Sequence, residues 1–141
     1  MIADDDEDDC VFFTDALGEL NLSVRLSCFS NGAALMDALS AGSFDSFPDI
    51  LFLDLNMPLK NGLECLLEIR NNRRFDRLPI IIFSTSSQKE AVDAAFARGA
   101  TFYLKKPDTF DKLKDSLQKI LKNALAEFPL AVSRQSFFID A

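Results

Sequence analysis

The sequence predicts an α/β fold in which a parallel sheet is covered by helices on both faces. Strand-like and helix-like patterns alternate from residue 1 to about residue 126. The runs 50–53 and 80–83 are continuously apolar, as expected of strands buried on both faces. Five strand–helix units in succession imply parallel strands joined by helical crossovers. With 141 residues, 48% of them hydrophobic, the chain can form one domain around one core.

The first two units lie before residue 43. Residues 1–3 form the end of a strand, and residues 22–29 alternate like a half-buried strand. The first helix is expected at 8–20, because its apolar residues fall on roughly one face: Val11, Phe12, Ala16, Leu17 and Leu20. A second, short helix at 33–39 follows the turn Ser30-Asn31-Gly32 and is stopped by Ala41-Gly42.

The remaining three units follow in the same order. Strands are expected at residues 49–53, 79–83 and 101–104, and helices at 63–70, 88–97 and 108–125. The fourth helix ends at Arg98-Gly99, which suits a C-terminal cap. The last helix has Asp108 or Thr109 as its N-cap.

Composition excludes several functional classes. The net charge of −7 disfavours nucleic acid as a partner, because phosphate contacts need a basic surface. Histidine is absent, which removes His-dependent hydrolytic catalysis and the commonest zinc ligand. The cysteines Cys10, Cys28 and Cys65 have no metal-site spacing and are interpreted as small buried hydrophobes. No apolar run approaches the roughly 18 residues of a membrane span, and the acidic N-terminus is unlike a signal peptide. A cytoplasmic protein without a membrane partner is expected.

Polar side chains follow four of the predicted strands. Asp4 and Asp5 come after the first strand, Asp54 after the third, Ser84 after the fourth, and Lys105-Lys106 after the fifth. The carboxyl ends of parallel strands meet at one rim of an open sheet, where ligands bind. The acids can bind a divalent cation and supply a carboxylate nucleophile, while the hydroxyl and lysine can hold phosphoryl oxygens. This combination indicates phosphoryl transfer.

Five motifs together resemble the receiver domain of two-component response regulators. They are Ile2-Ala3-Asp4-Asp5, Asp54-Leu55-Asn56-Met57-Pro58 followed by Asn61-Gly62, Ser84, Gly99-Ala100, and Lys106-Pro107. Each is weak alone, but their order and spacing are specific. The resemblance covers about residues 1–126 and implies a flavodoxin-like, doubly wound, five-stranded sheet of order 2-1-3-4-5. Residues 127–141 form a tail too short for a separate domain, so we expect a stand-alone, chemotaxis-type receiver.

The resemblance also implies roles for the rim residues. Asp54 is expected to be the phospho-acceptor, and Lys106, rather than Lys105, to pair with the phosphoryl group. Mg²⁺ is expected to be held by Asp5 directly, Asp4 through water, Asp54, and the backbone carbonyl of Asn56. Ser84 matches the switch hydroxyl and Tyr103 the aromatic switch residue that turns inward on activation.

Some residues keep a second interpretation. Thr85 is the alternative to Ser84, and Tyr103 can instead be a half-buried strand residue. Asp8 and Asp9 are interpreted as charges that complement a helix dipole. Asp6 either tunes the metal from outside its ligand shell or has no part in it. The first strand is short compared with the family, in which several more residues precede the acid pair. Either the start is assigned late or the domain tolerates a short strand.

The expected partners are a histidine kinase or a His-phosphotransfer protein, together with an unknown output protein or a second copy in a phosphorylation-dependent homodimer. In the family the output surface comprises the residues matching 88–97, 101–104 and 108–125. The apolar tail residues Phe137-Phe138-Ile139 either fold back onto their own domain or dock onto a partner.

The chain is not expected to be an enzyme beyond catalysing its own phosphorylation and dephosphorylation. Two alternatives are a phosphorylation-silent binding module and a dehalogenase-like phosphohydrolase. The latter needs a second Asp where Asn56 stands.

Overall fold

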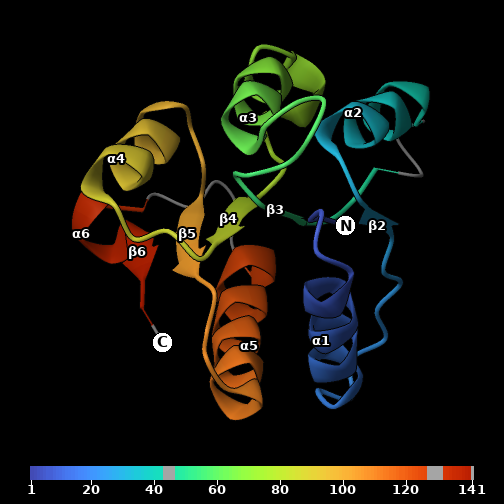
Figure 1. Ribbon diagram of the computed structural model, residues 1–141, viewed down its shortest axis with the longest axis vertical. Helices are drawn as coiled ribbons and strands as arrows, with labels where there is room; N and C mark the ends of the chain where they lie inside the picture. The colour runs from blue at the N-terminus through green and yellow to red at the C-terminus, as the bar shows by residue number, and fades with distance from the viewer. Residues whose placement is uncertain (43–46, 127–131, 141) are drawn as a thin grey trace.

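The computed structural model describes residues 1–42, 47–126 and 132–140. One parallel sheet lies between two helical layers, with α1 and α5 on one face and α2, α3 and α4 on the other (Figure 1). The strands are β1 (Ile2–Ala3), β2 (Cys28–Phe29), β3 (Leu51–Leu53), β4 (Ile80–Ser84), β5 (Phe102–Lys105) and β6 (Phe138–Ile139). The helices are α1 (Glu7–Gly18), α2 (Gly32–Ala41), α3 (Gly62–Arg70), α4 (Lys89–Ala97), α5 (Phe110–Ala126) and α6 (Arg134–Phe137), and a 3₁₀ turn, η2, covers Arg73–Phe75.

The sheet has six strands in the order β2-β1-β3-β4-β5-β6. The predicted order of the first five is confirmed, but the predicted number of strands is wrong. β6 lies in the tail and pairs in parallel with β5, with Tyr103 opposite Phe138 and Leu104 opposite Ile139. A strand of two residues has no periodicity of its own. Its conformation depends on the open edge of β5, which no local sequence pattern reveals.

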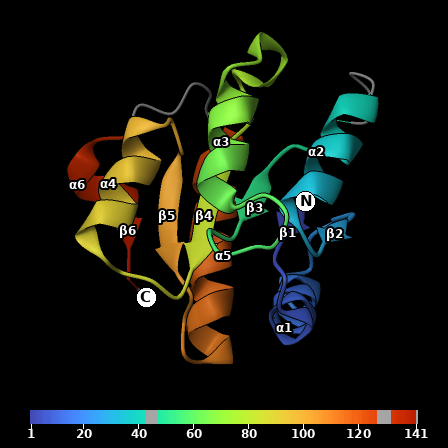
Figure 2. The same cartoon turned by 45° about the horizontal axis from the view of Figure 1, so that its top comes forward.

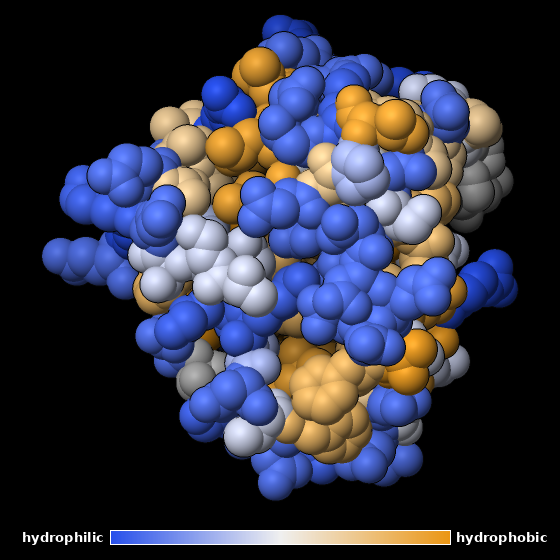
Figure 3. All heavy atoms as spheres, viewed as in Figure 1, coloured by the Kyte–Doolittle hydropathy of each residue, from blue (hydrophilic) through white to orange (hydrophobic). Residues whose placement is uncertain are grey.

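The two apolar runs are buried on both faces, as predicted. Alternate residues of each strand point to opposite helical layers. One core cluster, under α2, α3 and α4, contains Leu51, Leu53, Ile80, Ile82 and Tyr103. The other, under α1 and α5, contains Ile2, Phe52, Ile81, Phe83 and Leu104. Hydrophilic residues dominate the outer surface seen in Figure 3, and apolar side chains appear there in small groups.

The five predicted helices begin and end within two residues of their expected bounds. Asp6 caps α1 by accepting hydrogen bonds from the amides of Asp8 and Asp9, and Asn61 caps α3 in a capping box. The predicted C-terminal cap after α4 is confirmed by Gly99, whose φ is +90°. Thr109 Oγ1 accepts from the Lys112 amide at 3.3 Å, so Thr109 caps the start of the last helix.

Gly62 brings α3 directly against the strand end that holds Asp54. A Cβ at position 62 would lie 2.1 Å from the Asp54 carbonyl oxygen, closer than any side chain can approach. The Gly62 amide donates to the Leu55 carbonyl at 2.9 Å. The missing side chain therefore sets the position of α3 relative to the rim.

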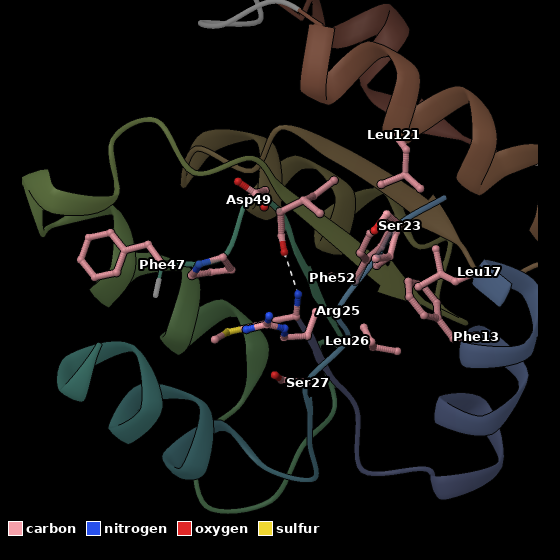
Figure 4. A pocket seen from close by; sticks show the side chains of 14 residues that line it. Phe13, Leu17, Ser23, Arg25, Leu26, Ser27, Phe47, Asp49, Phe52 and Leu121 are labelled. Atoms are coloured by element: carbon pink, nitrogen blue, oxygen red, sulfur yellow. Dashed lines mark hydrogen bonds between the residues drawn. The ribbon is translucent and has the colours of Figure 1, made fainter. Parts of the chain in front are cut away.

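The predicted strand at 22–29 is wrong over most of its length. Only Cys28 and Phe29 are paired, opposite Ile2 and Ala3, and residues 22–27 have no strand assignment. A strand needs a ladder partner, and β1 supplies only two residues. On the other side of β1, the Met1 ammonium donates to the Ile50 carbonyl at 2.9 Å, at the start of the β1–β3 ladder. Beside it lies a pocket of about 720 Å³, with Phe13, Leu17 and Leu121 on one side (Figure 4).

Within the described ranges, no helix combines the length and the apolar character needed to cross a membrane.

Candidate functional site

The predicted acids meet at the carboxyl rim of the sheet. Asp4 follows β1 and Asp54 follows β3, and these two strands are neighbours. One carboxylate oxygen from each of Asp4, Asp5 and Asp54 lies within 4.8 Å of the others. Asp4 and Asp54 are buried, whereas Asp5 is exposed. The sequence-predicted acidic group is therefore assembled, with one member open to solvent.

Burial makes the ionised form of Asp54 unfavourable. Asp54 is 5% exposed, and desolvation raises its pKa to about 6. Lys106 and the amides of Leu55 and Asn56 oppose this rise, and Asp4 adds to it. The Leu55 amide donates to Asp54 Oδ1 at 2.8 Å. An added cation would stabilise this carboxylate, because it offsets both the desolvation and the neighbouring charge.

Asp4 has an oxygen that suits a metal ion. Its Oδ1 accepts from the Asp6 amide at 3.0 Å. Its Oδ2 is buried and pairs with the Lys106 ammonium at 2.7 Å. Carboxylate oxygens, one of them exposed to admit water, are the donor set that Mg²⁺ prefers, so these residues fit the ion.

Lys106 is shared by three carboxylates. Its Nζ lies 2.7 Å from Asp4 Oδ2, 2.7 Å from Asp9 Oδ2 and 3.8 Å from Asp54 Oδ2. Burial alone would lower the pKa of Lys106, but its contacts with Asp4 and Asp9 raise that pKa above its ordinary value. Lys106 therefore stays positively charged at the rim. Lys105 instead points to Asp140, at 3.6 Å, in agreement with the choice of Lys106 over Lys105.

Asp9 is the site residue that sequence reasoning missed. It was interpreted as a helix-dipole charge, and it does lie in the first turn of α1. Its carboxylate also contacts Lys106, with 2.7 Å between Asp9 Oδ2 and Nζ. The available signal was its place in the first turn of the helix that follows the acid pair, but that place alone does not predict the contact with Lys106. Asp6, in contrast, is used as a helix cap.

Ser84 and Tyr103 are connected through Ser86. Ser84 is the last residue of β4 and is fully buried, whereas Thr85 is exposed, which favours Ser84 as the rim hydroxyl. The Ser86 amide donates to Ser84 Oγ at 3.2 Å, and the Tyr103 hydroxyl donates to the Ser86 carbonyl at 2.8 Å. Tyr103 lies in strand β5, as its alternative interpretation expects, but it is 0% exposed rather than half-buried. Its switch role stays a prediction.

Asn56 lies two residues beyond Asp54, in the loop between β3 and α3, and its side chain is exposed. Its amide helps to lower the pKa of Asp54. That contact places the backbone of residue 56 beside the acids. The predicted role of its carbonyl as a metal ligand stays a prediction.

Comparison with known proteins agrees with this geometry. The family model for the response regulator receiver domain matches residues 1–118. The probable methanogenesis regulatory protein FilR2 of Methanothrix harundinacea is 26% identical over 122 residues, which are 85% of this chain and 79% of that protein. The chemotaxis protein CheY1 of Helicobacter pylori is 38% identical over 72 residues, 51% of this chain and 58% of that protein.

Two solved structures share the fold over nearly the whole chain. The Mn²⁺-bound form of response regulator Rcp1 has a TM-score of 0.77 and 27% identity, and the alignment covers 93% of this chain and 96% of that one. The phosphorylated cyanobacterial phytochrome response regulator RcpA has a TM-score of 0.80, 25% identity and the same coverage. With the rim geometry and the family match over residues 1–118, these likenesses show that the chain belongs to the response regulator receiver domain family.

Proposed function

We propose that this receiver accepts a phosphoryl group on Asp54 in a Mg²⁺-dependent reaction and passes the signal on through protein contacts. The donor is a histidine kinase or a His-phosphotransfer protein. The observation that supports this most is the convergence of Asp4, Asp5 and Asp54 within 4.8 Å of one another, with Lys106 against them. RcpA is described as phosphorylated and Rcp1 as Mn²⁺-bound, which is consistent with the same chemistry here.

The reaction moves one phosphoryl group between two nucleophiles. An Asp54 carboxylate oxygen attacks the phosphorus, the bond from phosphorus to the donor breaks, and an acyl phosphate forms. The Leu55 amide fixes Oδ1, and Oδ2 faces Lys106, so Oδ2 is the oxygen oriented for attack. Such a transfer depends on alignment and charge neutralisation more than on covalent catalysis.

The surrounding groups have separate tasks. Asp4, Asp5, Asp54 and the Asn56 carbonyl would hold Mg²⁺, which would supply positive charge to offset that of the phosphoryl oxygens. Lys106 supplies a second cation on the β5 side, and it must shift from Asp9 toward the phosphoryl group to do so. Ser84 Oγ, at the end of β4, donates to a phosphoryl oxygen. The chain acts on its own Asp54 and turns over no external metabolite.

A labelled small phosphodonor separates this function from its competitors. Wild-type protein is incubated with Mg²⁺ and radiolabelled acetyl phosphate, and bound label and released phosphate are both measured. One labile, hydroxylamine-sensitive phosphoryl group per chain is expected. A chain that takes up no label would instead be a phosphorylation-silent binding module. Continuous multiple-turnover hydrolysis of external phosphoesters would indicate a phosphohydrolase, which Asn56 in place of a second Asp disfavours.

The metal assignment can be tested without phosphorylation. Asp5→Asn removes the exposed member of the acid group, and Mg²⁺ affinity is measured by calorimetric titration. We expect a weakening of about tenfold or more, which corresponds to about 1.4 kcal/mol. Asp8→Asn is the matched control, because Asp8 is an exposed acid in the first turn of α1 and is expected to bind as wild type does. Equal affinities for Asp5→Asn and wild type would refute the site.

A further inference from the structure

Residues 133–140, which we call the strap, lie along the α4–β5 side of the domain. α6 lies beside α4, and β6 continues the sheet beyond β5 (Figure 2). Of the two alternatives left open for the apolar tail, the structure shows folding back for the described residues 132–140. The strap occupies the face formed by α4 and the outer edge of β5, which would otherwise expose backbone groups.

Phe137 anchors the strap. It is 0% exposed and packs edge-to-face on Phe96 of α4, with 5.1 Å between ring centroids. Its centroid is 6.4 Å from that of Tyr103, and the Phe138 ring is 5.7 Å from Tyr103. Aromatic pairs at these distances are favourable beyond simple burial. The strap therefore covers Tyr103 with two rings.

Ion pairs fix the strap at both ends. Arg134 donates from Nε and Nη2 to Asp93 Oδ1, at 3.0 and 2.6 Å. Asp93 also binds Lys89 at 2.7 Å. At the other end, Asp140 lies 3.6 Å from Lys105. These pairs are partly exposed, so they contribute orientation more than stability.

A continuous set of contacts joins the strap to the phospho-acceptor rim. Phe137 and Phe138 pack on the Tyr103 ring, and the Tyr103 hydroxyl is bonded to the Ser86 carbonyl. The Ser86 amide is bonded in turn to Ser84 Oγ, at the rim. A Tyr103 side chain turned outward would need the space that the two phenylalanine rings fill.

We propose that the strap is an intramolecular ligand of the α4–β5 face that holds Tyr103 inward and is thereby coupled to the state of Asp54. The coupling rests on the proposed function. A phosphoryl oxygen that accepts a hydrogen bond from Ser84 draws residues 84–86 toward the rim, and the Tyr103 hydroxyl follows Ser86. An inward Tyr103 leaves room for Phe137. Strap docking and phosphorylation therefore favour the same arrangement, and each must strengthen the other. A partner that reads this face has to displace the strap.

The contact of the strap with Tyr103 is testable by fluorescence, because the chain has one tyrosine and no tryptophan. Acrylamide quenching of Tyr103 is compared in wild type, Phe137→Ala and Arg134→Gln, with Gln135→Ala as the control at an exposed position of α6. Both strap variants are expected to be quenched more strongly than wild type and Gln135→Ala, with unchanged helix content by circular dichroism. Quenching equal to wild type in both Arg134→Gln and Phe137→Ala would overturn the proposal that the strap holds Tyr103 inward.

The coupling is tested with beryllofluoride and Mg²⁺, a mimic of the acyl phosphate, titrated into the same full-length variants. Phe137→Ala is expected to bind the mimic about fivefold more weakly or worse, and Gln135→Ala as wild type does. Saturable binding of equal strength in all variants would overturn the coupling alone. Failure of wild type to bind the mimic would overturn the proposed phospho-acceptor function and the coupling together, while the strap contact would still be decided by quenching.

Discussion

Asp54→Asn is expected to abolish acyl-phosphate formation completely while leaving the fold intact. The amide has the shape of the carboxylate but cannot act as the nucleophile. Labelling with radiolabelled acetyl phosphate and Mg²⁺ measures the effect directly. Asp37→Asn is the control, since Asp37 is an exposed acid on α2, and it is expected to label as wild type does. A labelled Asp54→Asn protein would place the nucleophile at another residue.

The same variant is also expected to be more stable than wild type in the absence of metal. Burial raises the pKa of Asp54 from 3.8 to about 6, so the folded state prefers the neutral form. Wild-type stability is therefore lost as pH rises from about 4 to about 6, and the loss stays constant above that pH. A shift of this size corresponds to at most about 3 kcal/mol. Urea unfolding with EDTA at pH 4 and pH 7.5 should show an advantage of Asp54→Asn that grows with pH.

The second large effect is expected for Lys106→Met, which removes the cation but keeps an apolar stem against Phe83, whose ring lies 5.4 Å from Nζ. Loss of a charge placed at a developing anion typically slows a reaction by about 10²–10³-fold. We expect a slowing of that order in phosphorylation by acetyl phosphate, measured as the initial rate of label uptake at saturating Mg²⁺.

Two further variants separate the role of Lys106 from simple charge loss. Lys105→Met removes the neighbouring lysine, which faces Asp140, and its rate is expected to stay near that of wild type. Asp9→Asn frees one side of Lys106, so the ammonium can approach the phosphoryl group more easily and the rate should not fall. A Lys105→Met protein as slow as Lys106→Met would contradict the assignment.

The rim was predictable because its chemistry follows directly from strand ends. Asp54 closes an apolar run, and parallel topology brings it to Asp4 and Ser84 whatever the details of packing. Asp9 was not predictable in the same way. Its contact with Lys106 spans 97 positions in the chain and depends on how α1 docks on the sheet.

The two errors in the predicted sheet have one physical cause. Residues 22–26 alternate like a strand but have no described ladder partner, and at residue 27 the carbonyl accepts from the Ile2 amide at 2.9 Å. Residues 138–139, in contrast, have no strand pattern but pair with the open edge of β5. Strand formation depends on context more than helix formation does. The five predicted helices, whose hydrogen bonds are internal, lie within two residues of their expected bounds. The short helix α6 in the tail was not predicted, and strand identity was decided by neighbours distant in sequence.

The missing ladder beside residues 22–27 and the adjoining pocket imply that the sheet does not open uniformly. Backbone amides of β4 are enclosed by β3 and β5, so their hydrogen exchange requires disruption of the whole sheet. Amides of 22–27 lie outside the assigned strands and are expected to exchange through smaller, more frequent openings. We therefore expect the β2 side to open separately from the rest of the sheet. It can fray while the strand ends that hold Asp54, Ser84 and Lys106 remain in place.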